Sequence, residues 1–300
     1  MFGKNHWKGV DIAPWQLVLL VVVFLAVAAA VFCAVTFVGK KRGKKFERST
    51  RDLTYGAVCL AASYALSFIS IYSLPNGGTI TPASALPLLI YCYYFGFRKS
   101  LVVAVAYSLL QLVQKPYIVS PYSAVFDYLL PYAAFSLAGI FSFRPNAYAA
   151  VLEKKKPLLA AHGRFFIGVG LYFVVRYLSH VLAGVLFWSN LYDSSFLIWS
   201  GELTGAVAWG YSLTYNALFL VPDTLLAVAA GVAVLCSKTF NRFMASSVAA
   251  QTISAAYAAA EPQASAAATD PVPAAATAAA SVAADESAAA DDTASAGTER

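Results

Sequence analysis

Charged residues are scarce in this 300-residue sequence: they make up 12% of it, whereas hydrophobic residues make up 60%. The mean hydropathy of +0.65 is higher than a soluble domain usually tolerates. Cysteine is also rare, and its four occurrences lie inside apolar runs without the CxxC or His/Cys spacing of a metal site. We interpret Cys33, Cys59, Cys92 and Cys236 as small buried hydrophobes.

Catalytic sequence motifs are absent as well. The chain contains no HExxH, GxSxG, paired-aspartate or P-loop motif. Catalysis therefore finds little support, and a chain without a P-loop cannot itself hydrolyse ATP. No unit of about 20 to 50 residues repeats, and no strand alternation suggests a membrane barrel.

Long apolar segments dominate instead, and about 20 helical residues suffice to cross the hydrocarbon core of a bilayer. The sequence predicts an all-α integral membrane protein. Its seven expected helices lie near residues 15–38, 54–72, 82–97, 100–114, 122–143, 165–188 and 207–236.

Lysine and arginine predict the orientation of these helices. Sixteen of the twenty-one basic residues lie in four regions, which are 40–51, 98–99, 144–164, and the pair Lys238 and Arg242. If every segment crosses the membrane, these regions share one side, and the positive-inside rule makes that side cytoplasmic. The N-terminus is then external and the C-terminus internal.

The two ends of the chain differ from its centre. The first apolar run exceeds twenty residues and its basic flank follows it, which favours a retained helix over a signal peptide. We expect residues 1–52 to form an extra transmembrane helix with a basic linker. Residues 245–300 are rich in Ala, Ser, Thr and acids, and we expect a disordered cytoplasmic tail.

Polar residues of the predicted helices gather near the external loops. In this topology Asp127, His180, Trp188, Tyr211 and Asn216 approach one level in the outer leaflet. Ionisable residues are costly inside a membrane, so such a cluster predicts a functional site. One carboxylate among many aromatic rings suits a flat, cationic ligand.

Other interpretations of these residues stay open. Asp127 and Arg176 would also suit a structural ion pair, and His180 alone would suit a core histidine. Trp188 and Tyr211 would serve equally as interfacial anchors. We assign no site role to Asp223, which follows the kinking Pro222.

The sequence resembles the thiamine-specific substrate-binding (S) components of energy-coupling factor (ECF) transporters, which are six-helix membrane proteins. The similarity covers residues 57–236. It rests on the motifs NGGTIT, YIVSPYSAVFDYLLPYAAFSLAGIF, RYLSHVLAGVLFW, and YSLTYN followed by Pro222. The resemblance implies a six-helix thiamine-binding domain over residues 53–244, capture of thiamine outside the cell, and no cofactor.

The resemblance also implies roles for single residues. The expected thiamine contacts are Tyr117, Asp127, Tyr128, His180, Gly184, Trp188, Tyr211 and Asn216. Arg176, His180, Gly184 and Trp188 recur every four residues and so form a stripe along one face of a helix. In this stripe Trp188 would offer a ring face, and Gly184 would let the ligand lie against the backbone. Arg176 would tether the floor of the pocket to an acid or a carbonyl.

A transmembrane coupling subunit and two ATPase subunits are the implied partners. Ala57 and Ala61 would pack against the coupling subunit, because small residues four apart let helices approach closely. One feature departs from the family, since residues 73–81 lack the tryptophan that covers the ligand in some members.

Three alternatives remain at this stage. The ligand would be a thiamine precursor or another vitamin in the first. In the second, the chain would be a lipid-modifying membrane enzyme with Asp127 and His180 as acid and base. In the third, it would be a scaffold without a ligand.

Overall fold

The computed structural model describes residues 14–41, 49–114, 117–118, 120–154, 157–188, 205–244 and 246–247. Except for residues 246 and 247, which are helical, the predicted tail lies outside the described residues. The predicted external residues before α1 also lie outside them.

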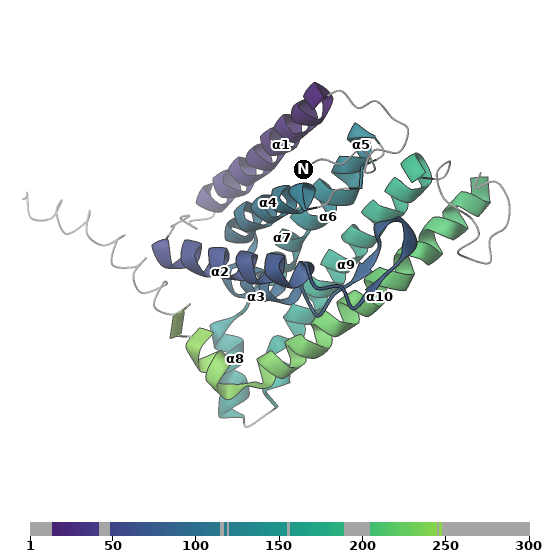
Figure 1. Cartoon of the computed structure of the whole chain (residues 1–300). Coiled ribbons are helices and arrows are strands. Elements are labelled where there is room, and N and C mark those ends of the chain that lie inside the picture. The colour runs from purple at the N-terminus through teal and green to yellow at the C-terminus, as the bar shows by residue number, and fades with distance from the viewer. Residues whose placement is uncertain are drawn as a thin grey trace, which may run out of the picture. The chain divides into compact units, whose positions relative to one another are not determined.

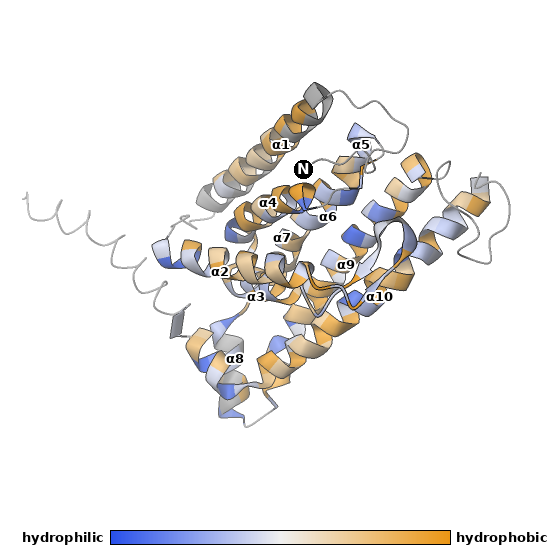
Figure 2. Cartoon of the chain, in the orientation of Figure 1, coloured by the Kyte–Doolittle hydropathy of each residue, from blue (hydrophilic) through white to orange (hydrophobic). Residues whose placement is uncertain are grey.

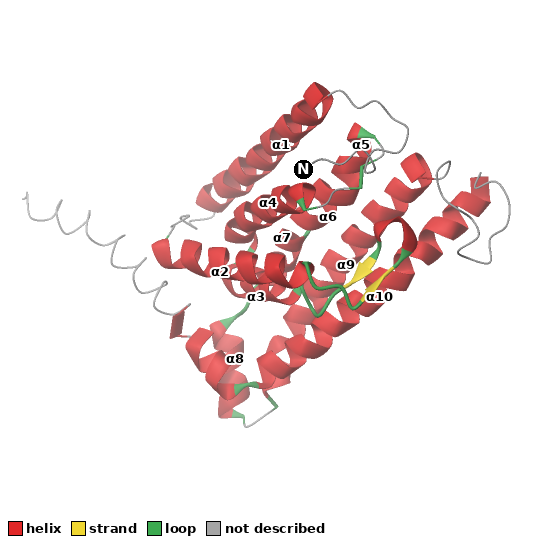
Figure 3. Cartoon of the chain, in the orientation of Figure 1, coloured by secondary structure: helices red, strands yellow, loops and turns green. Residues whose placement is uncertain are grey.

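Helices make up nearly all of the described chain, which confirms the all-α prediction (Figures 1 and 3). The α-helices are α1 Pro14–Lys41, α2 Thr50–Ser67, α3 Leu86–Phe95, α4 Phe97–Val113, α5 Pro121–Ala124, α6 Leu130–Ala133, α7 Phe135–Ala138, α8 Pro145–Glu153, α9 Gly163–Ala183 and α10 Gly205–Cys236. Two π-helices, η2 Val125–Leu129 and η5 Gly184–Trp188, and three 3₁₀ segments, η1 Pro75–Gly77, η3 Gly139–Phe141 and η4 Leu158–His162, complete the helical elements.

Each of the seven predicted segments falls on helical elements, with some differences at the ends. Within the described residues, three stretches are long and apolar enough to cross a membrane: Pro121–Phe141, Leu158–Trp188 and Gly205–Cys236. The first of these is not one continuous helix but a succession of short helical pieces. Seven crossings therefore remain a prediction.

Local sequence signals explain several helix ends. Ser49 and Asp52 form a capping box at the start of α2, because each side chain accepts a backbone N–H of the other. Gly96 separates α3 from α4 with φ +78°, a conformation that a residue with a Cβ rarely adopts.

The predicted external loop 73–81 contains a small β-hairpin that sequence patterns did not indicate. Its strands β1 (Tyr72–Ser73) and β2 (Thr79–Ile80) pair antiparallel, with Tyr72 opposite Ile80. They flank η1, where Gly77 has φ +99°. The hairpin passes in front of α9 and α10 in the view of Figure 3, and β2 contacts α10.

Several described residues near the basic regions are joined by polar contacts. Asp52 in α2 forms an ion pair with Lys99 in α4. Tyr94 in α3 donates a hydrogen bond of 3.0 Å to Asn241, and the neighbouring Tyr93 lies 3.1 Å from Nδ1 of His162. These contacts join the start of α2 to α4, and the end of α3 to segment η4 and to the residues after α10; the orientation in the membrane stays a prediction.

The described part of the chain exposes many large apolar side chains. Val102, Ile167, Leu178, Leu218 and Leu225 are among them. Hydrophobic residues occur along most of the described helices (Figure 2). In water so much exposed apolar surface would promote association, whereas in lipid it is the expected exterior. The core centres on α3, in which eight of ten residues are buried, and on an aromatic cluster around it.

Candidate ligand-binding site

Two π-helical segments carry the principal residues of the site. Asp127 lies in η2, and Trp188 ends η5. Pro131, four residues after Asp127, cannot donate to the Asp127 carbonyl and crowds it, so the regular α-helical pattern is interrupted there. Near η5, the Ser212 hydroxyl donates to the Val181 carbonyl at 2.8 Å, which inserts a side chain into that turn. π-Helical turns frequently mark functional sites.

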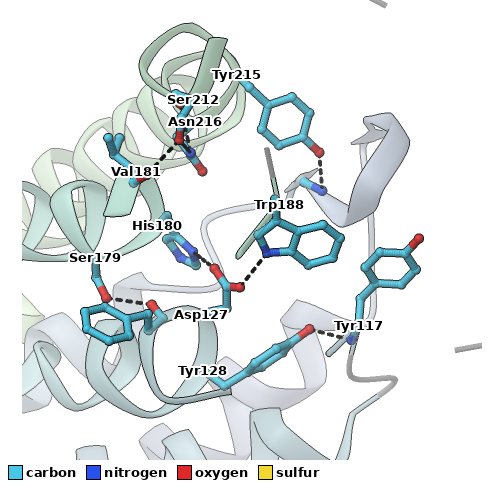
Figure 4. A network of polar contacts seen from close by, with 12 residues as sticks. Tyr117, Asp127, Tyr128, Ser179, His180, Val181, Trp188, Ser212, Tyr215 and Asn216 are labelled. Carbon is cyan, nitrogen blue, oxygen red and sulfur yellow. Dashed lines mark hydrogen bonds and ion pairs between the residues drawn. The ribbon is translucent and has the colours of Figure 1, made fainter. Parts of the chain in front are cut away.

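Asp127 is the polar centre of the site (Figure 4). His180 donates from Nδ1 to its Oδ1 at 3.2 Å, and Trp188 donates from Nε1 to its Oδ2 at 3.0 Å. The side chains of Asp127 and His180 are 14% and 12% exposed, so the carboxylate is largely removed from solvent. Ser179 fixes η2 against α9 by donating to the Phe126 carbonyl at 2.6 Å.

Aromatic rings form the adjoining wall. Tyr117 stacks on Trp188 with ring centroids 5.0 Å apart and planes inclined by 9°. The hydroxyl of Tyr128 accepts the backbone N–H of Tyr117 at 2.7 Å, which holds the chain before α5 against η2. This wall presents π faces beside a carboxylate, as expected for a flat cationic ligand.

These residues surround a cavity of about 120 Å³. Seven predicted residues line it: Tyr117, Asp127, Tyr128, Arg176, His180, Trp188 and Asn216. The lining also includes six residues that our sequence analysis did not assign to the site: Gly77, Gly78, Thr79, Tyr132, Tyr215 and Phe219. Tyr215 and Phe219 continue the four-residue spacing of Tyr211 along α10, and this periodicity would have revealed them.

Gly184 has a different role from the one expected. It is not among the residues that line the cavity, and a Cβ built on it would lie 2.1 Å from Ser212 Oγ. Its small size is therefore required for the contact between η5 and α10. The structure does not favour the prediction that Gly184 makes room for a ligand.

Tyr211 also lies outside the lining of the cavity. It is fully buried and stacks on Tyr215, with centroids 5.9 Å apart and planes inclined by 9°. Tyr211 thus supports a cavity residue from behind.

Arg176 lines the deeper part of the cavity and pairs with Asp223, not with Asp127. Its NH1 lies 3.4 Å from Asp223 Oδ2 and donates to the hydroxyl of Tyr172 at 2.6 Å. The alternative of a structural Asp127–Arg176 pair is therefore wrong, and Asp127 remains available to a ligand. The prediction that Arg176 is tethered to an acid agrees with this geometry.

Three buried nitrogens within the described residues have no hydrogen-bond partner: His162 Nε2, Arg176 Nε and His180 Nε2. Of these residues, Arg176 and His180 line the cavity. Buried polar atoms are nearly always satisfied, so these two call for a polar ligand group. The described residues contain no group of three or more His, Cys, Asp or Glu side chains arranged for a metal ion.

Comparison with known proteins identifies the family of the chain. The family model described as "Thiamine transporter protein (Thia_YuaJ)" matches residues 53–244. The chain belongs to this thiamine transporter family.

A curated relative supports the assignment. Thiamine transporter ThiT of Bacillus subtilis (strain 168) is 26% identical over 173 residues, which cover 57% of this chain and 82% of the relative. A solved structure of ThiT from Listeria monocytogenes superimposes with a TM-score of 0.51 at 22% identity. The superposition covers 64% of this chain and 96% of the Listeria monocytogenes chain, and it supports the fold.

These findings confirm the main conclusion from the sequence. The chain is a thiamine-specific S component of the ECF type, located in a membrane, and it is a transport protein and not an enzyme. The alternative of a lipid-modifying enzyme is therefore not supported. Helix α1 precedes the matched residues and packs against α4 and α5.

Proposed function

We propose that the cavity beside Asp127 is the thiamine site of this transporter. The observation that carries the proposal is the arrangement of one buried carboxylate, two partnerless nitrogens and stacked aromatic rings around a single cavity. Thiamine has a permanently cationic thiazolium ring and an aminopyrimidine ring with hydrogen-bonding atoms. The carboxylate and the ring faces suit the former, and the polar side chains suit the latter.

The individual contacts follow from this chemistry. Asp127 retains unused lone pairs, because a carboxylate has about four acceptor sites and two donors reach it here. His180 uses Nδ1 as a donor, so Nε2 of the neutral ring accepts a hydrogen bond from the ligand amino group. Trp188 and Tyr117 cover a ring of the ligand, and Asn216 adds an amide at the cavity wall.

We further propose that the chain works with a transmembrane coupling subunit and two ATPase subunits. Ala57 and Ala61 are exposed and lie one turn apart on α2. Because their side chains are small, another helix can approach the backbone of α2 closely there. In this arrangement the cavity opens to the outside, the N-terminus is external, and the basic end and the C-terminus are cytoplasmic.

The direct test is a thiamine titration of the detergent-purified chain without ATP. We expect one thiamine per chain by calorimetry, with a Kd of about 1 μM or tighter, and quenching of tryptophan fluorescence. Quenching should be lost in Trp188→Phe and retained in Trp209→Phe, which removes a half-exposed indole on α10 outside the cavity. Absence of binding at micromolar thiamine would refute the proposal.

A competition experiment separates thiamine from the alternative ligands. An aminopyrimidine precursor without the thiazolium ring should displace thiamine weakly, because it lacks the cation that pairs with Asp127. Tighter binding of the precursor than of thiamine would assign the site to the precursor instead. Mass spectrometry of small molecules retained during purification gives an independent identification.

A further inference from the structure

We call residues 72–81 the hairpin segment; its Gly77, Gly78 and Thr79 line the cavity, and side chains of α10 hold it. The Tyr215 hydroxyl accepts the backbone N–H of Gly78 at 3.0 Å and donates to the Pro75 carbonyl. A Cβ on Gly78 would lie 2.8 Å from the Phe219 ring, so the turn sits directly on α10. Tyr215 is 3% exposed, and its bonds are shielded from water.

A second attachment lies two helical turns further along α10. Asp223 Oδ1 accepts the backbone N–H of Thr81 at 3.1 Å and its hydroxyl at 2.6 Å. The other carboxylate oxygen faces Arg176, which lines the deep part of the cavity. Asp223 therefore joins the end of the hairpin segment to the floor of the site.

The hairpin cannot hold its own position. Each strand has two residues, and an isolated two-stranded hairpin is marginally stable at best. Leu74 and Ile80 pack the segment against the apolar cluster of α10, which gives no directional hold. The polar attachments to Tyr215 and Asp223 add the directional contacts that fix the turn and the end of the segment.

The same segment also borders an adjoining polar cavity of about 330 Å³. Gly77, Thr79 and Arg176 line both cavities. A movement of the hairpin segment therefore changes the walls of the thiamine site and of this second space together. The side of the site formed by the hairpin segment is held by the packing of Leu74 and Ile80 and by the polar bonds to Tyr215 and Asp223.

We propose that Tyr215 and Asp223 form a clasp that positions the hairpin segment over the site, with Tyr215 as the attachment that releases. Tyr215 holds the turn through one neutral hydroxyl, whereas Asp223 receives two bonds from Thr81 and an ion pair from Arg176, so it acts as the fixed end. Release of Tyr215 opens the cavity and sets the rate at which the ligand leaves. The ligand part of this inference rests on the proposed thiamine function.

The test compares Tyr215→Phe with Tyr177→Phe. Tyr177→Phe also removes one interhelical hydrogen bond, which the Tyr177 hydroxyl donates to the Leu213 carbonyl at 2.8 Å. Tyr177 does not line the cavity. Bound radiolabelled thiamine is chased with excess unlabelled thiamine. We expect Tyr215→Phe to dissociate roughly tenfold faster or more, with little change in association rate, and Tyr177→Phe to match the unmodified chain.

Hydrogen exchange without ligand tests the clasp separately. Amides of residues 74–80 should exchange faster in Tyr215→Phe and stay protected in Tyr177→Phe. Thr81→Val should raise exchange near residue 81, whereas Thr214→Val, which removes a local bond to the Gly210 carbonyl, should not. Thr81→Val also tests the clasp if Tyr215→Phe fails to fold.

The outcomes separate the two proposals. If the unmodified chain binds no thiamine, the proposed function fails, while the exchange data still test the clasp. If it binds thiamine and both tyrosine variants show equal dissociation and equal exchange, the clasp is refuted.

Discussion

Asp127 and Asp223 are two carboxylates within the helices that have different partners. Asp127 receives bonds from a histidine and an indole, both at the cavity. Asp223 is paired with the guanidinium of Arg176 and receives Thr81. Within the described residues no cation is paired with Asp127, so we expect it to pair with the proposed cationic ligand. Asp223 is already paired with Arg176, so we expect it to stabilise the folded structure.

This difference predicts opposite effects of two matched substitutions. Asp127→Asn keeps the shape and removes the charge, so thiamine affinity should fall about ten- to two-hundredfold, corresponding to about 1.5–3 kcal/mol. Asp223→Asn should instead lower stability by about 3–5 kcal/mol, because it leaves Arg176 buried without a counter-charge. Calorimetric affinity and melting temperature are measured on the same preparations.

Unchanged affinity in Asp127→Asn would exclude a ligand role for this carboxylate. A large stability loss in Asp127→Asn with none in Asp223→Asn would reverse the assignment of the two residues.

Gly184 shows how one missing side chain controls a helix contact. Gly184→Ala should destabilise the protein by about 1–3 kcal/mol, because the new Cβ would lie 2.1 Å from Ser212 Oγ. The control is Gly170→Ala in α9, where a Cβ would meet nothing within 4 Å and alanine favours the helix. Thermal unfolding measures Gly184→Ala in the unmodified chain and in the Ser212→Gly background, where it should cost less; an equal cost in both backgrounds would argue against this clash.

At the scale of elements, the two π-helices determine where the site residues point. A π-turn adds one residue to the ring closed by each hydrogen bond, and so it rotates the residues that follow relative to an unbroken α-helix. In η2 this places Asp127 within reach of His180 on α9 and Trp188 on η5. One carboxylate thus joins η2 to α9 and to η5, which directly follows α9 and is distant from η2 in the sequence.

Pro131 provides a test of this element. Pro131→Ala restores a backbone N–H that reaches the Asp127 carbonyl in a regular α-helix. We expect the π-turn to relax toward α-helix and thiamine to bind about tenfold more weakly, which corresponds to about 1.4 kcal/mol. The control is Pro121→Ala, because a proline in the first turn of a helix replaces no hydrogen bond. Equal affinities of the two variants would show that the π-turn does not depend on Pro131.

At the scale of the whole molecule, binding and transport should be separable. Ala61→Trp should abolish thiamine uptake by cells and leave binding to the purified protein unchanged, because the residue is exposed on α2 far from the residues of the cavity lining. Ile167→Trp on the exposed face of α9 is the control and should preserve both. Normal uptake by Ala61→Trp at equal expression would place the coupling surface elsewhere.

The sequence by itself determined the all-α membrane character, the family, and most of the residues around the cavity. Apolar runs and basic clusters are properties of the chain in one dimension, and a periodic stripe such as 176–188 needs only the geometry of a single helix. For the same reason Asp127, His180 and Trp188 were recognisable before their contacts were known.

The tertiary structure alone decided which charges pair and what each small residue does. Arg176 is separated from Asp223 by 47 residues, and nothing in the local pattern distinguished Asp223 from Asp127 as its partner. From the sequence, the missing side chain of Gly184 predicts room for a ligand, but in the structure Ser212 occupies that space. The hairpin segment, with strands of two residues, has too weak a local pattern to be predicted. It is held by apolar packing against α10 and by bonds to Tyr215 and Asp223, more than 130 residues away.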